Sequence, residues 1–112
     1  MRLANPSLTA AHMYNNWPEE RATAWARASP KQSALSFASP LKHAAYKDIP
    51  STYILCEQDG IIPPSKQEQY IENIRLATGK DVDVRRLNTN HVPNLTNVEE
   101  VVTLILEIAS TA

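Results

Sequence analysis

The second half of the chain alternates between two kinds of apolar pattern. "STYILC" (51–56) is a short, continuous, β-rich run, and "DVDVRRL" (81–87) alternates at Val82 and Val84. Between them, "SKQEQYIENIRLATG" (65–79) has helical spacing and a glycine at its end. A helix that crosses over between two strands implies that the strands are parallel. The pattern therefore predicts an α/β fold with two parallel strands.

A further helix is predicted over 97–110, where the apolar residues keep helical spacing. Asn97 and Glu100 form a capping-box pattern at its start. Two parallel strands make a poor sheet alone, because parallel sheets have several strands and both faces covered. We therefore interpret 49–112 as the C-terminal β-α-β-α portion of a larger sheet. Its exposed edge needs cover, from a homodimer or from a complementing chain.

Residues 1–48 have a different character, with many alanines, serines and prolines and little core of their own. Short helices are predicted over 16–28, with Pro18 near the first helical position, and again from 28–37, with Ser29 as the cap. This part is interpreted as a helical segment that leans on the rest of the chain.

Composition excludes several classes of function. A net charge of −1 gives no reason to expect a nucleic-acid partner or an anionic membrane surface. No apolar run reaches the about 18 to 20 residues of a membrane span, and the start of the chain lacks a signal-peptide pattern. Two glycines cannot build a Gly-rich phosphate loop, so no cofactor is predicted. The single cysteine, Cys56, fits a reducing compartment, and a cytoplasmic protein is expected.

One acidic and one basic side chain each follow a predicted strand. Asp59 lies in "LCEQDGIIPP" and His91 in "LNTNHVPNL". The carboxyl ends of adjacent parallel strands meet at one sheet edge, where ligands usually bind. An Asp–His pair there is the orienting and base half of a Ser-His-Asp arrangement, in which the carboxylate fixes the imidazole tautomer. No metal site is predicted, because His12 and His43 lack suitably spaced ligands.

The segments "IPSTYILCEQDGIIPPSKQEQYI" and "LNTNHVPNLTNVEEVVTLI" resemble the C-terminal end of α/β-hydrolase fold proteins, most closely the esterase and hydroxynitrile-lyase-like group. The family's two loops read roughly Cys/Thr-x-x-Asp-x-x-Ile-Pro and Gly-His-x-Pro-x-Leu-Ser. The resemblance implies that Asp59 and His91 are the triad acid and histidine. "MYNNWPEERATAWARASPKQSALSF" is similar to the helical cap of that group. A partial α/β-hydrolase fold, with cap-like helices before two parallel strands, is the expectation.

The chain departs from the family pattern in three ways. Asn90 stands where the family prefers glycine, and "TNVEE" replaces a Ser-x-Pro-type helix start. The family's nucleophile lies in G-x-S-x-G, and Gly60 and Gly79 are too far apart to flank such a serine. We expect a truncated or catalytically incomplete member. Ser51 and Ser65 are possible substitute nucleophiles, although Ser65 fits the start of a helix.

Several residues keep a second interpretation. His91 as a loop histidine and Asp59 before Gly60 also fit ordinary turn chemistry. Asp81 and Asp83 compete as partners of His91, but the start of a strand is the wrong sheet edge for them. Cys56 is interpreted as an inert core residue. Four further residues either line a substrate pocket in a cap or simply pack: Met13, Tyr14, Trp17 and Trp25.

Three functions follow. The first is hydrolysis of an ester or related small acyl substrate, with the nucleophile supplied from elsewhere. The second is a non-catalytic binding or interaction module that keeps Asp59 and His91 without chemistry. The third, by analogy alone, is an accessory protein of a biosynthetic pathway.

Overall fold

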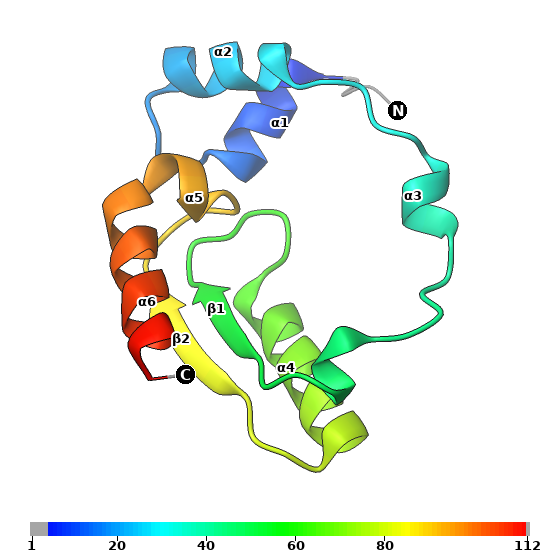
Figure 1. The fold of residues 1–112 in the computed structure, drawn as a ribbon. Helices are drawn as coiled ribbons and strands as arrows, with labels where there is room; N and C mark the ends of the chain where they lie inside the picture. Colours follow the sequence, from blue (N-terminus) through cyan, green and yellow to red (C-terminus); the bar gives the residue numbers. More distant parts are fainter. Residues whose placement is uncertain (1–4, 112) are drawn as a thin grey trace.

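Two parallel strands organise the computed structural model, which describes residues 5–111 (Figure 1). They are β1 (Thr52–Cys56) and β2 (Asp83–Leu87), with Cys56 opposite Leu87. The predicted parallel pair is therefore confirmed, in a chain of mixed helix and strand. Both strands end at the same edge, so the loops that follow them start side by side. Within residues 5–111, no helix is long and apolar enough to cross a membrane.

The crossover helix α4 (Pro64–Thr78) covers one face of the strands. It ends at Gly79, which adopts the left-handed conformation (φ 66°) that the glycine stop predicted. Leu55 is fully buried, and it packs with the nearly buried Ile71 and Val82 in a small core between α4 and the strands. This core fixes the strand ends from which both loops leave.

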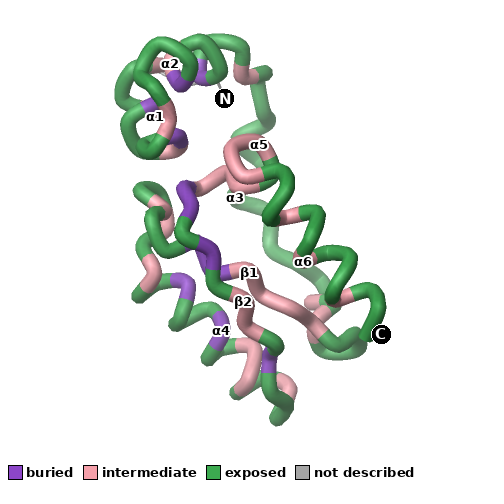
Figure 2. Tube along the Cα trace, turned by 90° about the vertical axis from the view of Figure 1, so that its left-hand side faces the viewer, coloured by how far each residue is buried: buried purple, intermediate pink, exposed green. Residues whose placement is uncertain are grey.

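Helix α6 (Val98–Ser110), preceded by the short α5 (Pro93–Thr96), lies on the other face of the strands (Figure 2). Its residues Val101, Leu104 and Ile108 are half-buried. The rest of its apolar side chains are exposed by about half or more: Val98, Val102, Ile105 and Leu106.

The capping-box pattern before α6 gives a different contact from the one predicted. The Asn97 side chain makes no bond to the helix backbone, and its Nδ2 donates instead to Oε1 of Glu100 at 2.8 Å. Its Oδ1 accepts from the hydroxyl of Thr89 at 2.7 Å and lies 2.9 Å from the hydroxyl of Thr96, whose one hydrogen is shared with Oδ1 of Asn90. The side chain of Asn97 therefore joins the His91 loop to Glu100 and does not cap α6.

Helices α1 (Pro6–Met13) and α2 (Glu19–Ala28) form a hairpin beyond the carboxyl ends of the strands (Figure 1). Their core consists of small residues and one ring: Ala10, Tyr14, Ala22 and Ala26. Val92 and Leu95, which follow β2, pack against this core. The hairpin thus packs against the segment that follows His91.

The segment from 29 to 50 departs from the prediction. The expected helix beginning at Ser29 is wrong, since Ser29 ends α2 in an extended conformation (ψ 130°). Pro30 favours this conformation of the residue before it, which explains why α2 ends here. The same conformation would suit a helix cap, but a short helix needs an apolar face to bury and this segment is exposed. Only α3 (Leu35–Ala38) and a 3₁₀ turn, η1 (Ala45–Lys47), form here, and every residue from 31 to 43 is exposed. The boundary drawn between 48 and 49 stays a prediction.

Candidate acid–base site

Asp59 is held by the loop that follows β1. Its Oδ1 accepts from the backbone N–H groups of Ile61 and Ile62, at 2.8 and 2.9 Å. An aspartate that bonds the backbone two and three residues ahead stabilises a turn. The side chain is only 6% exposed. These contacts fix the plane of the carboxylate and leave Oδ2 available to another partner.

His91 is that partner. Its Nδ1 lies 2.9 Å from Oδ2 of Asp59, and its side chain is 27% exposed. With the carboxylate ionised, Nδ1 carries the hydrogen of this bond, and the neutral ring then presents the lone pair of Nε2. Within residues 5–111, Nε2 has no hydrogen-bond partner. The structure thus brings together the two residues singled out in the sequence, with one ring nitrogen open.

A buried glutamine supports the Asp59 loop, and sequence reasoning missed it. Gln67, on α4, is 3% exposed. Its Oε1 accepts from the Cys56 N–H at 2.9 Å, and its Nε2 donates to the carbonyls of Cys56 and Ile62, at 2.9 and 2.8 Å. It therefore ties both ends of the loop to the helix. The available signal was its position one turn before Ile71 on the buried face of α4.

Asn90 supports the His91 loop from within. It is fully buried, and its Oδ1 accepts from the Val92 N–H and from the hydroxyl of Thr96, both at 3.0 Å. Its Nδ2 donates to Oδ1 of Asn16. A buried amide with every polar atom engaged holds its loop in one conformation. The asparagine noted as a departure from glycine is therefore a structural element of this loop.

The competing partners of His91 are occupied elsewhere. Asp83 bonds Nε of Arg85 at 3.0 Å, and this bond is the main reason why its pKa lies below the usual value. The Asp81 side chain is 97% exposed and lies 3.4 Å from Arg75. Both are at the opposite end of β2 from His91.

None of the substitute nucleophiles is hydrogen-bonded to His91 in the described part of the chain. Burial, followed by the charge of Asp59, raises the pKa of the Cys56 thiol, which favours the weakly nucleophilic neutral form. Ser51 lies before β1, at the far end of the strand, and its hydroxyl donates to the Ile49 carbonyl at 3.1 Å. Ser65 lies in the first turn of α4, as predicted for a helix start.

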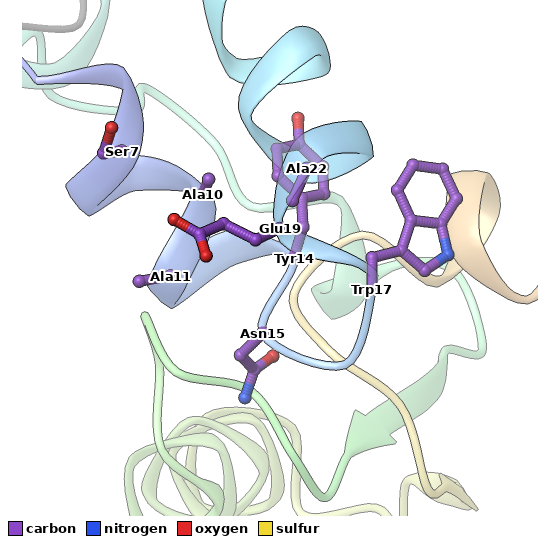
Figure 3. Close-up of a pocket in the computed structure, with 8 residues that line it drawn as sticks. All are labelled: Ser7, Ala10, Ala11, Tyr14, Asn15, Trp17, Glu19 and Ala22. Atoms are coloured by element: carbon purple, nitrogen blue, oxygen red, sulfur yellow. The ribbon is translucent and has the colours of Figure 1, made fainter.

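The α1–α2 hairpin contains a cavity of about 290 Å³ (Figure 3). Tyr14 and Trp17 line it, with their rings stacked 6.1 Å apart, and Arg21 lies 4.2 Å over the Trp17 ring. Trp25 is 45% exposed and does not line it. Neither Asp59 nor His91 lines the cavity, so it is not the reaction centre itself.

No group of three His, Cys, Asp or Glu side chains that could hold a metal ion occurs between residues 5 and 111. The surface does contain a second histidine–aspartate contact, His43 with Asp48 at 2.5 Å. Both side chains of that contact are more than 60% exposed. It offers a matched comparison for the buried pair.

Two curated proteins are similar to most of this chain. "Probable hydrolase R7" of Phoma sp. is 42% identical over 77 residues, which are 69% of this chain and 32% of the relative. "Alpha/beta hydrolase nvfD" of Aspergillus novofumigatus is 34% identical over 84 residues, covering 73% of this chain and 31% of the relative. The chain is related to α/β hydrolases. It spans about a third of the length of these relatives.

No family model matches the chain. No solved structure matches it either. The relation to α/β hydrolases therefore stands on these two relatives, and the family resemblance noted in the sequence agrees with it.

Proposed function

We propose that this α/β-hydrolase relative provides the acid and the base for hydrolysis of an ester or related small acyl substrate, in the manner of the esterase and hydroxynitrile-lyase-like group. Residues 49–112 would be the last two β/α units of the fold, and 1–48 its helical cap-like segment. The observation that carries the proposal is the 2.9 Å contact between Asp59 and His91. It is supported by the backbone bonds to the other carboxylate oxygen and by the open Nε2.

The chemistry follows from the two nitrogens of His91. Nε2 removes the proton from an attacking hydroxyl as that oxygen bonds to the acyl carbon. Asp59 stabilises the imidazolium that forms, without taking its proton. The imidazolium then returns the proton to the departing alkoxide, which leaves as an alcohol. In the second half, Nε2 removes a proton from water as the water oxygen attacks the acyl carbon. The imidazolium then returns this proton to the nucleophile oxygen, and the acyl group leaves as a carboxylic acid.

The 112 residues contain no nucleophile motif of the family. The sequence has no G-x-S-x-G, and none of the substitute nucleophiles is hydrogen-bonded to His91 within residues 5–111. Removing any triad member leaves only the catalysis of the oxyanion hole and substrate binding. We therefore propose that Asp59 and His91 act on a nucleophile carried by another segment or another chain.

We expect the 112-residue chain alone to hydrolyse p-nitrophenyl acetate no faster than buffer does, because it lacks an attacking group. Joined downstream of the G-x-S-x-G segment of a related hydrolase, it is expected to give hydrolysis that neither part gives separately. Release of p-nitrophenol measures both rates, and circular dichroism establishes that the fusion is folded. A folded fusion that releases p-nitrophenol no faster than the chain alone would contradict the proposal.

A second function, an interaction module without chemistry, is favoured by the exposed apolar residues of α6: Val98, Val102, Ile105 and Leu106. Such a stripe suits a docked partner, either a second copy or a complementing chain. The same fusion decides between the two functions, because an interaction module gives no hydrolysis at any concentration of fused chain.

A further inference from the structure

The turn between α1 and α2 contacts both loops of the acid–base pair. Asn15 Nδ2 donates to the carbonyl of Gln58 at 2.8 Å. Asn16 Oδ1 accepts from Nδ2 of Asn90. Gln58 immediately precedes the acid of the pair, and Asn90 immediately precedes its base. Two consecutive asparagines are therefore bonded to the two residues that come just before the acid and the base.

The bond to Asn90 is costly to lose. Asn90 is fully buried, and its oxygen is already engaged by two donors of its own loop. Its NH₂ group donates to Asn16. Without that acceptor the buried donor would be unsatisfied, which costs about 1–3 kcal/mol of stability. Figure 3 shows the neighbouring Asn15 pointing from the turn towards the loop after β1.

The end of α1 also touches the Asp59 loop through the backbone. A Cβ placed on Gly60 would lie 2.6 Å from the carbonyl oxygen of His12. No side chain fits between Gly60 and His12, so the backbone of the loop packs directly against the backbone of the helix end. The turn is held in place by Tyr14, which is 5% exposed within the hairpin core. Movement of the turn therefore moves both loops.

We infer that Asn15 and Asn16 are positioning residues, which set the Asp59 and His91 side chains at hydrogen-bond distance by holding their loops to one rigid turn. The inference rests on the proposed function of the pair. It goes beyond that function, because it assigns to the α1–α2 hairpin a direct role in orienting the imidazole.

Asn15 uses the NH₂ group of its side-chain amide and Asn16 uses the oxygen, so one kind of substitution distinguishes the two contacts. Asn15 donates and Asn16 accepts, so the same change to aspartate has opposite effects. Asn15→Asp places a carboxylate against the Gln58 carbonyl and breaks the contact. Asn16→Asp keeps the acceptor for Asn90, and a charged acceptor is stronger. Each variant adds one negative charge, so their general effects on folding are matched.

The readouts are the fraction of His91 in the Nδ1–H tautomer, from ¹⁵N NMR of the neutral ring, and the exchange rates of the Ile61 and Ile62 amides. We expect Asn15→Asp to deplete that tautomer and to speed both exchange rates about five- to tenfold, as loss of one hydrogen bond predicts. Asn16→Asp is expected to keep the tautomer and to stay within about twofold of wild type. If Asn15→Asp unfolds the chain, Asn15→Ala removes the donor without adding charge and is read the same way.

Asn73→Asp is the control, since Asn73 is exposed on α4 and its side chain has no hydrogen-bond partner in the described part of the chain. The inference is overturned if Asn15→Asp keeps the wild-type tautomer, if Asn16→Asp loses it equally, or if Asn73→Asp has the same effect. A wild-type chain that itself lacks the Nδ1–H tautomer would instead contradict the proposed function. The two failures are thus distinguishable.

Discussion

His91→Ala is expected to lower kcat for p-nitrophenyl acetate by about 10⁶-fold in the chain complemented with a nucleophile, since loss of the histidine from a triad removes nearly all of its catalysis. The attacking hydroxyl then has no base, and the departing alkoxide has no acid. KM should change little, because the imidazole acts on the reacting atoms rather than on binding. Steady-state hydrolysis with the complemented chain measures both constants.

His43→Ala is the matched control for that substitution. His43 also contacts an aspartate, Asp48, but both are largely exposed on the surface. Its replacement should leave kcat within about twofold of wild type, as surface substitutions away from a site usually do. Equal losses for His43→Ala and His91→Ala would show that the assay reports stability rather than catalysis. A His91→Ala chain that keeps wild-type kcat would remove His91 from the mechanism.

Asp59→Asn is expected to lower kcat by about 10⁴-fold, as the wrong imidazole tautomer does in a serine triad. Asparagine keeps an oxygen for the Ile61 and Ile62 amides, so the loop retains its turn. Its NH₂ group then faces His91 Nδ1, which must accept a hydrogen bond instead of donating one. Nε2 consequently carries the proton and cannot act as the base. The kcat of the complemented variant measures this loss.

Asp48→Asn provides the control for Asp59→Asn, because it makes the same change in the exposed histidine–aspartate contact. We expect Asp48→Asn to leave the kcat of the complemented chain unchanged. The thermal midpoint of Asp59→Asn should stay close to wild type, since the asparagine keeps the bonds to both backbone amides. If the kcat of Asp59→Asn is unchanged while the chain stays folded, Asp59 does not orient the base.

Much of the fold could be predicted because local patterns determine it. "STYILC" gave the strand over Thr52–Cys56 to within one residue, and Gly79 ended α4 as its conformational freedom predicts. The order of strand, helix and strand then required the loops of Asp59 and His91 to leave the same edge. Topology placed the two loops at one edge, and the resemblance to α/β hydrolases predicted that the two side chains pair; they lie 2.9 Å apart.

The supporting contacts could not be predicted in the same way, because they join residues far apart in sequence. Asn16 and Asn90 are 74 residues apart, and nothing local to either indicates the other. Gln67 resembled any polar residue of an amphipathic helix until its burial was known. The helix predicted after Ser29 did not form although the local signals suited its start, because residues 31–43 are all exposed and a short helix without a buried face is not stable.

The tautomer of His91 in the wild-type chain is the most direct test of the Asp59–His91 account. ¹⁵N NMR of the histidine rings, at a pH where they are neutral, distinguishes a proton on Nδ1 from one on Nε2. If Asp59 orients the base, His91 carries its proton on Nδ1 and donates it to Asp59, and Asp59→Asn moves the proton to Nε2. A wild-type His91 protonated on Nε2, or divided between tautomers as an exposed histidine is, would contradict it.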